Sequence, residues 1–275
     1  MKEYILPILI FLGFGALSGI LLLIASKVLA VKTDETEAKI TEALPGANCG
    51  GCGYSGCAGY AAAVAHDGAP TNLCKPGGAD VMKKINAIMG TEGGEFIREV
   101  AYVRCNGCEK ATKDRFTFTG TKSCAAVEKF YNGKGECRFG CDGYGDCAAV
   151  CSNDAITITD GVAVVDPAKC GGCGKCVTAC PNHLIFLRKE TSTVALRCSS
   201  KDSGKVTRTV CTNGCIGCKI CEKKCPHGAV IVADNHAVID YDKCTSCGTC
   251  VSACPRKCLV NITCTHSEKA EQVDK

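Results

Sequence analysis

The feature that most constrains this chain is a cysteine-rich segment that occurs twice at an offset of 74 residues. The spacing C-x2-C-x2-C-x3-C covers residues 170–180 in the first copy and 244–254 in the second, and a proline follows both copies. Stretches rich in valine and isoleucine, 155–166 and 229–240, precede the two copies and coincide at the same offset. Nine cysteines of the first repeat, beginning with Cys124, fall on cysteines of the second repeat without a gap. The chain therefore contains an internal duplication built around its cysteines.

The cysteine content indicates that packed apolar side chains are not the main source of stability. There are 27 cysteines in 275 residues, but only 8 phenylalanines, 7 tyrosines and no tryptophan. Disulfide-rich domains carry cysteines in irregular loops, whereas regular short spacings that end in Cys-Pro are the ligand pattern of two-cluster bacterial ferredoxins. The formal charge of +4 and the 22% of charged residues do not suggest a nucleic-acid-binding protein. We expect [4Fe-4S] clusters at the centre of each repeat, and poor folding without them.

The second repeat contains both halves of the ferredoxin pattern. In such ferredoxins the fourth cysteine of each run ligates the cluster of the other run. An additional run in this repeat begins at Cys215 and is followed by Pro226. The crossed assignment predicts two sites, with Cys215, Cys218, Cys221 and Cys254 holding cluster 4 and Cys225, Cys244, Cys247 and Cys250 holding cluster 5.

The first repeat departs from this pattern at one position. Tyr144 stands where the second repeat has Cys218, while Cys137 lies upstream of Cys141. We interpret Cys137 as a displaced ligand; the alternative is a degenerate, empty half-site. The predicted sets are then Cys137, Cys141, Cys147 and Cys180 for cluster 2, and Cys151, Cys170, Cys173 and Cys176 for cluster 3.

A glycine-rich loop nearer the N-terminus has the different spacing C-x2-C-x4-C-x16-C. Its glycines allow the backbone to wrap closely around an inorganic core. The G-x-G-x-x-G pattern at 51–56 follows no predicted strand, so we assign it to cluster wrapping and not to dinucleotide binding. The predicted ligands of cluster 1 are Cys49, Cys52, Cys57 and Cys74. Zinc bound by four thiolates is the alternative.

Seven cysteines remain outside these five clusters, namely Cys105, Cys108, Cys124, Cys198, Cys211, Cys258 and Cys264. Cys105 and Cys108 form a C-x2-C pair that could hold a sixth cluster together with Cys124 and one other spare cysteine. The alternative is that the spare cysteines are small buried hydrophobic residues.

The N-terminus contains a run of uncharged residues from Tyr4 to Ser26 that is rich in leucine and isoleucine. This run is long enough to cross a hydrocarbon core of about 30 Å as one transmembrane helix. A cleaved signal peptide is the alternative, because Leu29 and Ala30 resemble a small-residue cleavage site. Lysines just after the run favour a cytoplasmic location for everything that follows it. The sequence thus predicts a single-pass anchor in the cell membrane.

The predicted fold class is α+β, with one transmembrane helix, a small [4Fe-4S] loop-helix domain and two duplicated ferredoxin-like domains. We expect helices over 58–66 and from 33–39 onward, and strands at 162–165 and 229–232. No catalytic constellation accompanies the clusters. The predicted boundaries are 1–30 for the anchor, 33–92 for the N-terminal cluster domain, 93–135 for a connecting segment, 136–190 and 198–264 for the ferredoxin-like domains, and 265–275 for a polar tail.

The order of these parts resembles the B subunit of the Rnf complex. The resemblance covers nearly the whole chain and rests on the loop 44–53 (LPGANCGGCG), which follows a membrane helix and precedes the ferredoxin runs. Ser152 departs from the pattern by replacing the expected proline, and the second repeat extends beyond shorter members. Rnf complexes are membrane assemblies that couple electron flow from reduced ferredoxin to NAD+ with export of Na+ or H+.

The resemblance implies an iron-sulfur relay subunit of a ferredoxin:NAD+ oxidoreductase with no substrate-converting site of its own. It implies electron transfer from reduced ferredoxin to flavin-bearing and membrane subunits, and no nucleic-acid partner. An electron-transfer subunit of another membrane dehydrogenase or reductase, including one that reduces a redox-sensing regulator, is the alternative. A metal-storage or sensor protein is disfavoured, because storage needs no ordered duplication.

The charge of the second repeat suggests where a partner binds. Residues 198–264 contain nine Lys or Arg against five Asp or Glu. Since small ferredoxins are commonly acidic, we expect this repeat to dock ferredoxin through Lys219, Lys223 and Lys224. A solvated lysine surface without a partner is the alternative.

Overall fold

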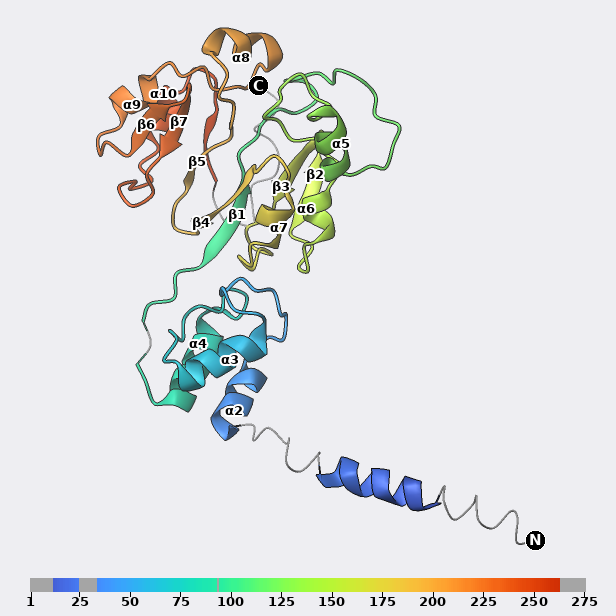
Figure 1. The fold of residues 1–275 in the computed structure, drawn as a ribbon. Coiled ribbons are helices and arrows are strands. Elements are labelled where there is room, and N and C mark those ends of the chain that lie inside the picture. The colour runs from blue at the N-terminus through green and yellow to red at the C-terminus, as the bar shows by residue number, and fades with distance from the viewer. Residues whose placement is uncertain (1–11, 25–33, 93, 263–275) are drawn as a thin grey trace, which may run out of the picture.

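The computed structural model describes residues 12–24, 34–92 and 94–262. Figure 1 shows a helical N-terminal domain between an N-terminal helix and two β-containing domains that lie side by side. Residues 12–24 are helical, and their large apolar side chains, such as Leu17 and Leu22, are exposed. Within the described part of the chain, no helix is both long and apolar enough to span a bilayer. The remainder of the predicted span from Tyr4 to Ser26 lies outside the described residues.

The N-terminal domain packs three helices, α2 (Glu35–Ala43), α3 (Cys57–His66) and α4 (Gly78–Met89). The helix expected over 58–66 is thus present, and the helix expected to begin within 33–39 begins at Glu35. The core is conventional, because Ile40, Tyr60 and Ile85 are almost fully buried at the centre of the three helices. The buried Tyr60 hydroxyl donates to the carbonyl of Pro70 (2.7 Å) and accepts from the N–H of Leu73 (3.2 Å). These bonds fasten the loop that leads to Cys74.

The first ferredoxin-like domain contains two antiparallel strand pairs and three short helices. Its elements are β1 (Glu99–Val103), α5 (Cys124–Tyr131), α6 (Asp146–Ala149), β2 (Ile156–Thr159), β3 (Val162–Val165), α7 (Lys175–Ala179) and β4 (Ile185–Lys189). Strand β1 pairs with β4, and β2 pairs with β3. The segment expected to connect domains, 93–135, therefore supplies one strand and one helix to this domain.

The second ferredoxin-like domain repeats this arrangement. Its elements are β5 (Val194–Leu196), α8 (Gly204–Val210), α9 (Ile220–Lys224), β6 (Val230–Ala233), β7 (His236–Ile239), α10 (Thr249–Ala253) and β8 (Leu259–Asn261). Strand β5 pairs with β8, and β6 pairs with β7. The predicted strands at 162–165 and 229–232 are present, the second shifted by one residue. The fold is mixed α/β, with ferredoxin-like domains as expected.

Hydrogen bonds reveal an equivalence between the repeats that the constant offset of 74 conceals. The Arg104 N–H donates to the carbonyl of Leu184, and the Arg197 N–H donates to the carbonyl of Cys258, both at 2.8 Å. Leu184 and Cys258 are equivalent at the 74-residue offset, so Arg104 and Arg197 are equivalent as well, although they lie farther apart in sequence. The residue after Arg104 is Cys105, which thus corresponds to Cys198. The constant offset matches Cys198 with Cys124 instead.

Cysteines form a large part of both ferredoxin-like cores. The first core combines Val103, Ile156 and Ile185 with cysteine side chains, and the second combines Val194, Leu259 and other small residues with five buried cysteines. Such cores contain few large apolar groups, so these domains depend on metal ligation for stability far more than the N-terminal domain does.

Candidate iron-sulfur centres

Site 1 unites the four cysteines predicted for cluster 1. Cys74 is buried in the N-terminal core, with Cys52 and Cys57 packed against that core. Burial, opposed by the Gly77 N–H, raises the pKa of the Cys74 thiol, and nearby Cys57, Cys49 and Cys52 add to the rise. All four sulfurs therefore converge at one end of the helical domain.

The loop of site 1 is shaped by residues that hold its backbone in unusual conformations. Asn48 has a positive φ of 43°, and its side-chain oxygen accepts from the N–H of Cys57 at 2.8 Å. Gly56, with φ of 117°, precedes α3 and lacks a capping side chain, so Asn48 supplies that cap from a distance. This bond fixes Cys57 at the helix N-terminus, facing the loop that carries Cys49 and Cys52.

Site 4 is a cavity of about 350 Å³ in the second ferredoxin-like domain. The four predicted ligands of cluster 4 all line it, together with Cys258. The Cys258 side chain lies within hydrogen-bonding reach of both Cys215 and Cys254, and it lowers the pKa of Cys215 to about 6 and that of Cys254 to about 5, although burial opposes both shifts. Cys258 stands at the position of Leu184 in the first repeat and supports two ligands here.

Site 5 is a cavity of about 280 Å³ in the same domain. It is lined by Cys225, Cys244, Cys247 and Cys250, the four predicted ligands of cluster 5. Cys225 comes from the end of α9, while the other three belong to the run before and within α10. The fold thus brings Cys225 into one cavity with three cysteines of the later run.

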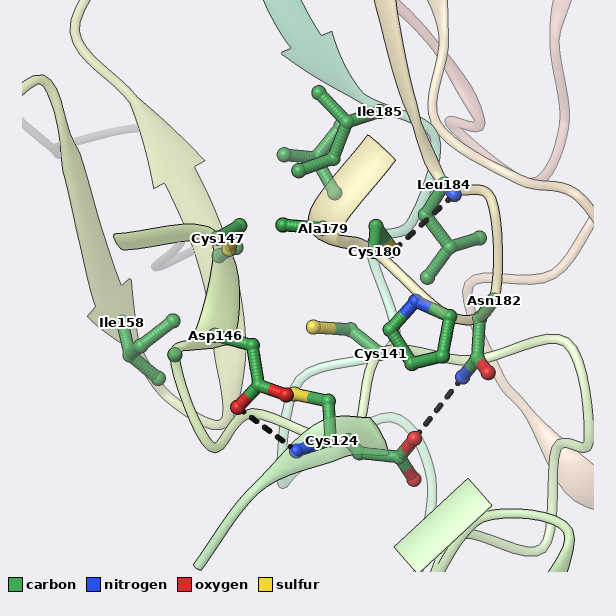
Figure 2. Close-up of a pocket in the computed structure, with 15 residues that line it drawn as sticks. Cys124, Cys141, Asp146, Cys147, Ile158, Ala179, Cys180, Asn182, Leu184 and Ile185 are labelled. Carbon is green, nitrogen blue, oxygen red and sulfur yellow. Dashed lines mark hydrogen bonds between the residues drawn. The ribbon is translucent and has the colours of Figure 1, made fainter. Parts of the chain in front are cut away.

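Site 2 differs from its prediction in one residue. Its cavity, of about 370 Å³, is lined by Cys141, Cys147 and Cys180 as expected, but the fourth cysteine is Cys124 (Figure 2). Cys137 does not line this cavity and instead lines a separate one. Burial raises the pKa of Cys147 to about 12, and the neighbouring sulfurs of Cys141, Cys124 and Cys180 add to the rise.

Cys124 reaches site 2 because Asp146 holds the first turn of α5. The Asp146 carboxylate accepts from the N–H groups of Cys124 (3.0 Å) and Ala125 (2.9 Å) and from the Ser123 hydroxyl (2.9 Å), and Figure 2 shows the first of these bonds. Burial alone would raise the pKa of Asp146, but these hydrogen bonds outweigh it and lower the pKa. Asp146 begins α6, directly after the segment in which Tyr144 replaces the expected cysteine. A cysteine from the start of α5 thus lines the cavity at site 2, whereas Tyr144, at the position of Cys218, does not.

Site 3 gathers the remaining predicted ligands of the first ferredoxin-like domain. Burial raises the pKa of Cys176 to about 12, and Cys170 and Cys173 lie close enough to add to the rise. Cys151 and Cys170 pack against the same core as Cys176. The N–H of Ala101 in β1 donates to the Cys170 sulfur at 3.3 Å, and the N–H of Ala155 donates to the Cys151 sulfur at 3.4 Å. The donor set suits a cluster, because hydrogen bonds to sulfur accompany thiolate ligation.

Two cysteines are exposed among the 26 that the structure describes, Cys218 and Cys247. They belong to sites 4 and 5 in the second ferredoxin-like domain. Lys219, which directly precedes α9, and Lys223 and Lys224, which end it, are exposed near Cys218 in the sequence. No ion pair joins these three lysines to another described residue. Cys264, the last of the spare cysteines, lies outside the described residues.

The five sites share one kind of donor set. Each of the five sites offers four thiols, several with backbone N–H groups directed at sulfur. Throughout the described ranges, no three His, Cys, Asp or Glu side chains are placed to share a single metal ion.

Family models match all three cluster-bearing parts of the chain. A model described as a putative Fe-S cluster covers residues 44–76. Models described as a 4Fe-4S dicluster domain cover residues 136–184, 169–229 and 214–259. These matches favour iron-sulfur clusters over the zinc alternative at the N-terminal loop.

Curated relatives match most of the chain. It is 40% identical over 248 residues to the B subunit of the ion-translocating oxidoreductase complex of Methanosarcina acetivorans, covering 90% of this chain and 94% of the relative. It is 43% identical over 260 residues to the B subunit of the Na(+)-translocating ferredoxin:NAD(+) oxidoreductase complex of Acetobacterium woodii, covering 94% and 78%. It is 36% identical over 260 residues to the B subunit of the proton-translocating ferredoxin:NAD(+) oxidoreductase complex of Clostridium ljungdahlii, covering 93% and 91%.

Proposed function

This chain belongs to the family of B subunits of the Rnf ion-translocating oxidoreductase complexes, which are iron-sulfur electron-transfer subunits, and from that premise we propose its specific part in the complex. It accepts electrons from reduced ferredoxin at its second ferredoxin-like domain and delivers them, through its N-terminal domain, to flavin-bearing and membrane subunits. Bound [4Fe-4S] clusters supply one-electron transfer, and the residues of the chain position them, shield them and admit the donor.

The proposed ligands follow the sequence prediction at four of the five sites. Site 1 uses Cys49, Cys52, Cys57 and Cys74; site 3 uses Cys151, Cys170, Cys173 and Cys176; site 4 uses Cys215, Cys218, Cys221 and Cys254; and site 5 uses Cys225, Cys244, Cys247 and Cys250. At site 2, Cys124 replaces Cys137 and joins Cys141, Cys147 and Cys180. The support for this replacement is the common cavity in Figure 2 and the Asp146 bonds that hold Cys124 beside it.

The N-terminal segment anchors the chain in the cell membrane by a single helix, with the cluster domains on the cytoplasmic side. The uncharged run from Tyr4 to Ser26 and the helical, exposed leucines within 12–24 support this anchor. Lys27 and Lys32, directly after the run, support the cytoplasmic orientation.

One observation carries the proposed place of electron acceptance: the exposed cysteines among the described ones are Cys218 and Cys247, both in the second ferredoxin-like domain. An exposed ligand brings a cluster close to a docked partner. The exposed lysines beside Cys218 give this surface the positive charge that attracts an acidic carrier. Accordingly, ferredoxin docks over α9 and meets site 4.

Anaerobic stopped-flow mixing of the full chain, purified in detergent with its clusters, tests this function. Reduced ferredoxin is added, and the bleaching of cluster absorbance is followed at low and high salt. We expect rapid bleaching that slows as salt rises, and no NADH when NAD+ is added to the isolated subunit. Absence of bleaching while the clusters stay intact would contradict the proposed donor and favour another membrane dehydrogenase.

A further inference from the structure

Four cysteines outside the five sites line one cavity between the two ferredoxin-like domains. They are Cys105, Cys137, Cys198 and Cys211, and the cavity measures about 550 Å³. This is more space than the cavities of about 370 Å³ and 350 Å³ at sites 2 and 4. Three of the four cysteines are buried and Cys137 is half-buried. The cavity therefore has room for a cluster of the size expected at sites 2 and 4.

The four cysteines form two equivalent pairs, one from each repeat. Cys105 and Cys198 each follow the arginine whose N–H bonds to equivalent carbonyls of Leu184 and Cys258. Cys137 and Cys211 are equivalent at the 74-residue offset, each four residues before the first ligand of the next site. Each domain thus contributes the same two positions to a shared cavity.

Backbone N–H groups lie close to all four sulfurs. The N–H of Gly107 donates to the Cys105 sulfur at 3.4 Å. The N–H groups of Phe139, Ser200 and Asn213, each two residues after its cysteine, lie near enough to the sulfurs of Cys137, Cys198 and Cys211 to oppose the rise in their pKa. The N–H of Cys215 also donates to the Cys198 sulfur at 3.3 Å, and the N–H of Cys141 faces the Cys105 sulfur in the same way. Hydrogen bonds to ligating sulfurs of this kind occur at cluster sites. A merely buried cysteine needs no such repeated pattern.

Positive charge and an unsatisfied donor line the same cavity. Arg104 and Arg197 are both among its lining residues. The Nε atom of Arg104 is buried and has no hydrogen-bond partner in the described structure, while the guanidinium carbon of this half-buried side chain lies 4.8 Å from the centre of the Phe186 ring. An unsatisfied buried donor and two arginines beside four sulfurs suit an anionic group, which four thiolates around a cluster would supply.

We propose that Cys105, Cys137, Cys198 and Cys211 hold a sixth [4Fe-4S] cluster that joins the two ferredoxin-like domains. Cys108, which the C-x2-C spacing pairs with Cys105, does not line the cavity and is not a ligand. The domains are fastened around the site, since the Thr112 hydroxyl donates to the Val210 carbonyl (2.7 Å) and the Asn213 side chain donates to the Asn106 carbonyl (3.0 Å).

The location of this sixth site gives it a role, which rests on the proposed relay function. Cys141 lines both the sixth cavity and site 2, and the N–H of Cys215, a ligand of site 4, bonds to the Cys198 sulfur. The sixth site therefore lies between sites 4 and 2. A cluster here would connect the sites of the second ferredoxin-like domain, which has the exposed cysteines, with those of the first. No other proposed site has ligands from both domains.

Native mass spectrometry of the full chain, purified anaerobically in detergent, tests the proposal. We expect the fully loaded species to carry six clusters, about 24 iron atoms in place of about 20. The variant Cys211→Ser should carry five, because Cys211 belongs to no other site. Cys108→Ser is the matched control, from the same loop as Cys105, and should carry six.

Three results would overturn the proposal: a maximum of five clusters in the unmodified chain, loss of a cluster in the Cys108→Ser variant, or a mass that fits zinc. If Cys211→Ser does not fold, the count in the unmodified chain still decides the matter. The relay function is judged separately by stopped-flow reduction. Six clusters without reduction by ferredoxin would contradict the relay function alone, whereas five clusters with normal reduction would contradict the sixth site alone.

Discussion

Gly51 and Cys173 are in such close contact that a β-carbon on Gly51 would lie 2.8 Å from the carbonyl oxygen of Cys173. Gly51 belongs to the loop of site 1, and Cys173 belongs to site 3. An ion pair between Lys75 and Glu99, at 2.9 Å, lies beside the same junction. The N-terminal domain thus meets the first ferredoxin-like domain at the loops that carry their cysteines. The sites therefore form a series through the molecule. It runs from site 4 through the sixth site to sites 2 and 3 and ends at site 1.

The contact between these loops predicts a specific defect in the variant Gly51→Ala. The added methyl group collides with backbone, which cannot move aside as a side chain could, so the two loops must separate. We expect NADH formation from reduced ferredoxin by the intact membrane complex to fall several-fold, with unchanged iron content of the subunit. Gly94→Ala is the control, since its methyl group would meet Asn72 at an ordinary 3.6 Å. A full rate in Gly51→Ala would mean that this junction carries no electrons.

The proposed use of Cys124 in place of Cys137 at site 2 predicts the loss of a cluster in one variant and its return in another. The variant Cys124→Ser should lose one cluster, about four iron atoms, from the first ferredoxin-like domain. Tyr144 occupies the position of Cys218 in the second repeat, so Tyr144→Cys restores the missing ligand. We expect the double variant to regain the cluster.

Iron and sulfide analysis, with the electron paramagnetic resonance spectrum of the reduced protein, measures both effects. Tyr144→Cys alone is the control and should keep the full count. If Cys124→Ser retains all its iron, Cys124 is not a ligand, and the proposed ligand set of site 2 is wrong.

The lysines of α9 predict a salt-dependent change in the rate of association. Reversing Lys223 and Lys224 to glutamate should slow the reduction by ferredoxin about tenfold at low salt, and the difference should vanish at high salt. The matched control reverses Lys83 and Lys84, an exposed pair on α4 with the same change in net charge. If both double variants slow equally, net charge and not a docking surface is responsible.

Most of the proposed ligands could be recognised in the sequence because the spacing within a run is set by local backbone geometry. Two residues separate Cys215 from Cys218 and Cys218 from Cys221, and all three line one cavity in the fold. Cys124 could not be found in this way, since its position depends on Asp146, which is distant in sequence and bonds to the start of α5. A signal was present nonetheless, because Tyr144 leaves site 2 one ligand short.

The sequence alone does not reveal that Cys105 and Cys198 occupy equivalent positions in the two repeats, and the reason is different. A constant offset of 74 aligns Cys198 with Cys124, but the segment after β1 is longer than the segment after β5. Only the backbone hydrogen bonds of Arg104 and Arg197 establish the correct equivalence. Strand pairing across long distances in sequence, such as β1 with β4, is set by tertiary contacts and has no local pattern.

Removal of the clusters should affect the domains unequally. The cores of the ferredoxin-like domains contain many cysteines, whereas the N-terminal core is built from Ile40, Tyr60, Ile85 and other ordinary side chains. We expect an iron chelator to abolish the near-ultraviolet signal and the strand content while the helices α2, α3 and α4 persist. Far-ultraviolet circular dichroism of the full chain during chelation measures this: helix content should fall only in part, because α5 to α10 are lost with the strands while α2, α3 and α4 remain. Loss of all helix content together with the strands would show that site 1 supports its domain equally.

The pH dependence of this chelation follows from the buried thiols of site 2. Burial raises the pKa of Cys141 and of Cys147 to about 12. Iron binds the thiolate, so at any pH below that value a proton competes with iron for each sulfur, and the competition strengthens as pH falls. Loss of iron to the chelator should therefore be faster at about pH 6 than at about pH 8. Iron release followed by absorbance at a fixed free chelator concentration measures the rate, and a rate independent of pH would show that proton uptake by these sulfurs does not accompany cluster loss.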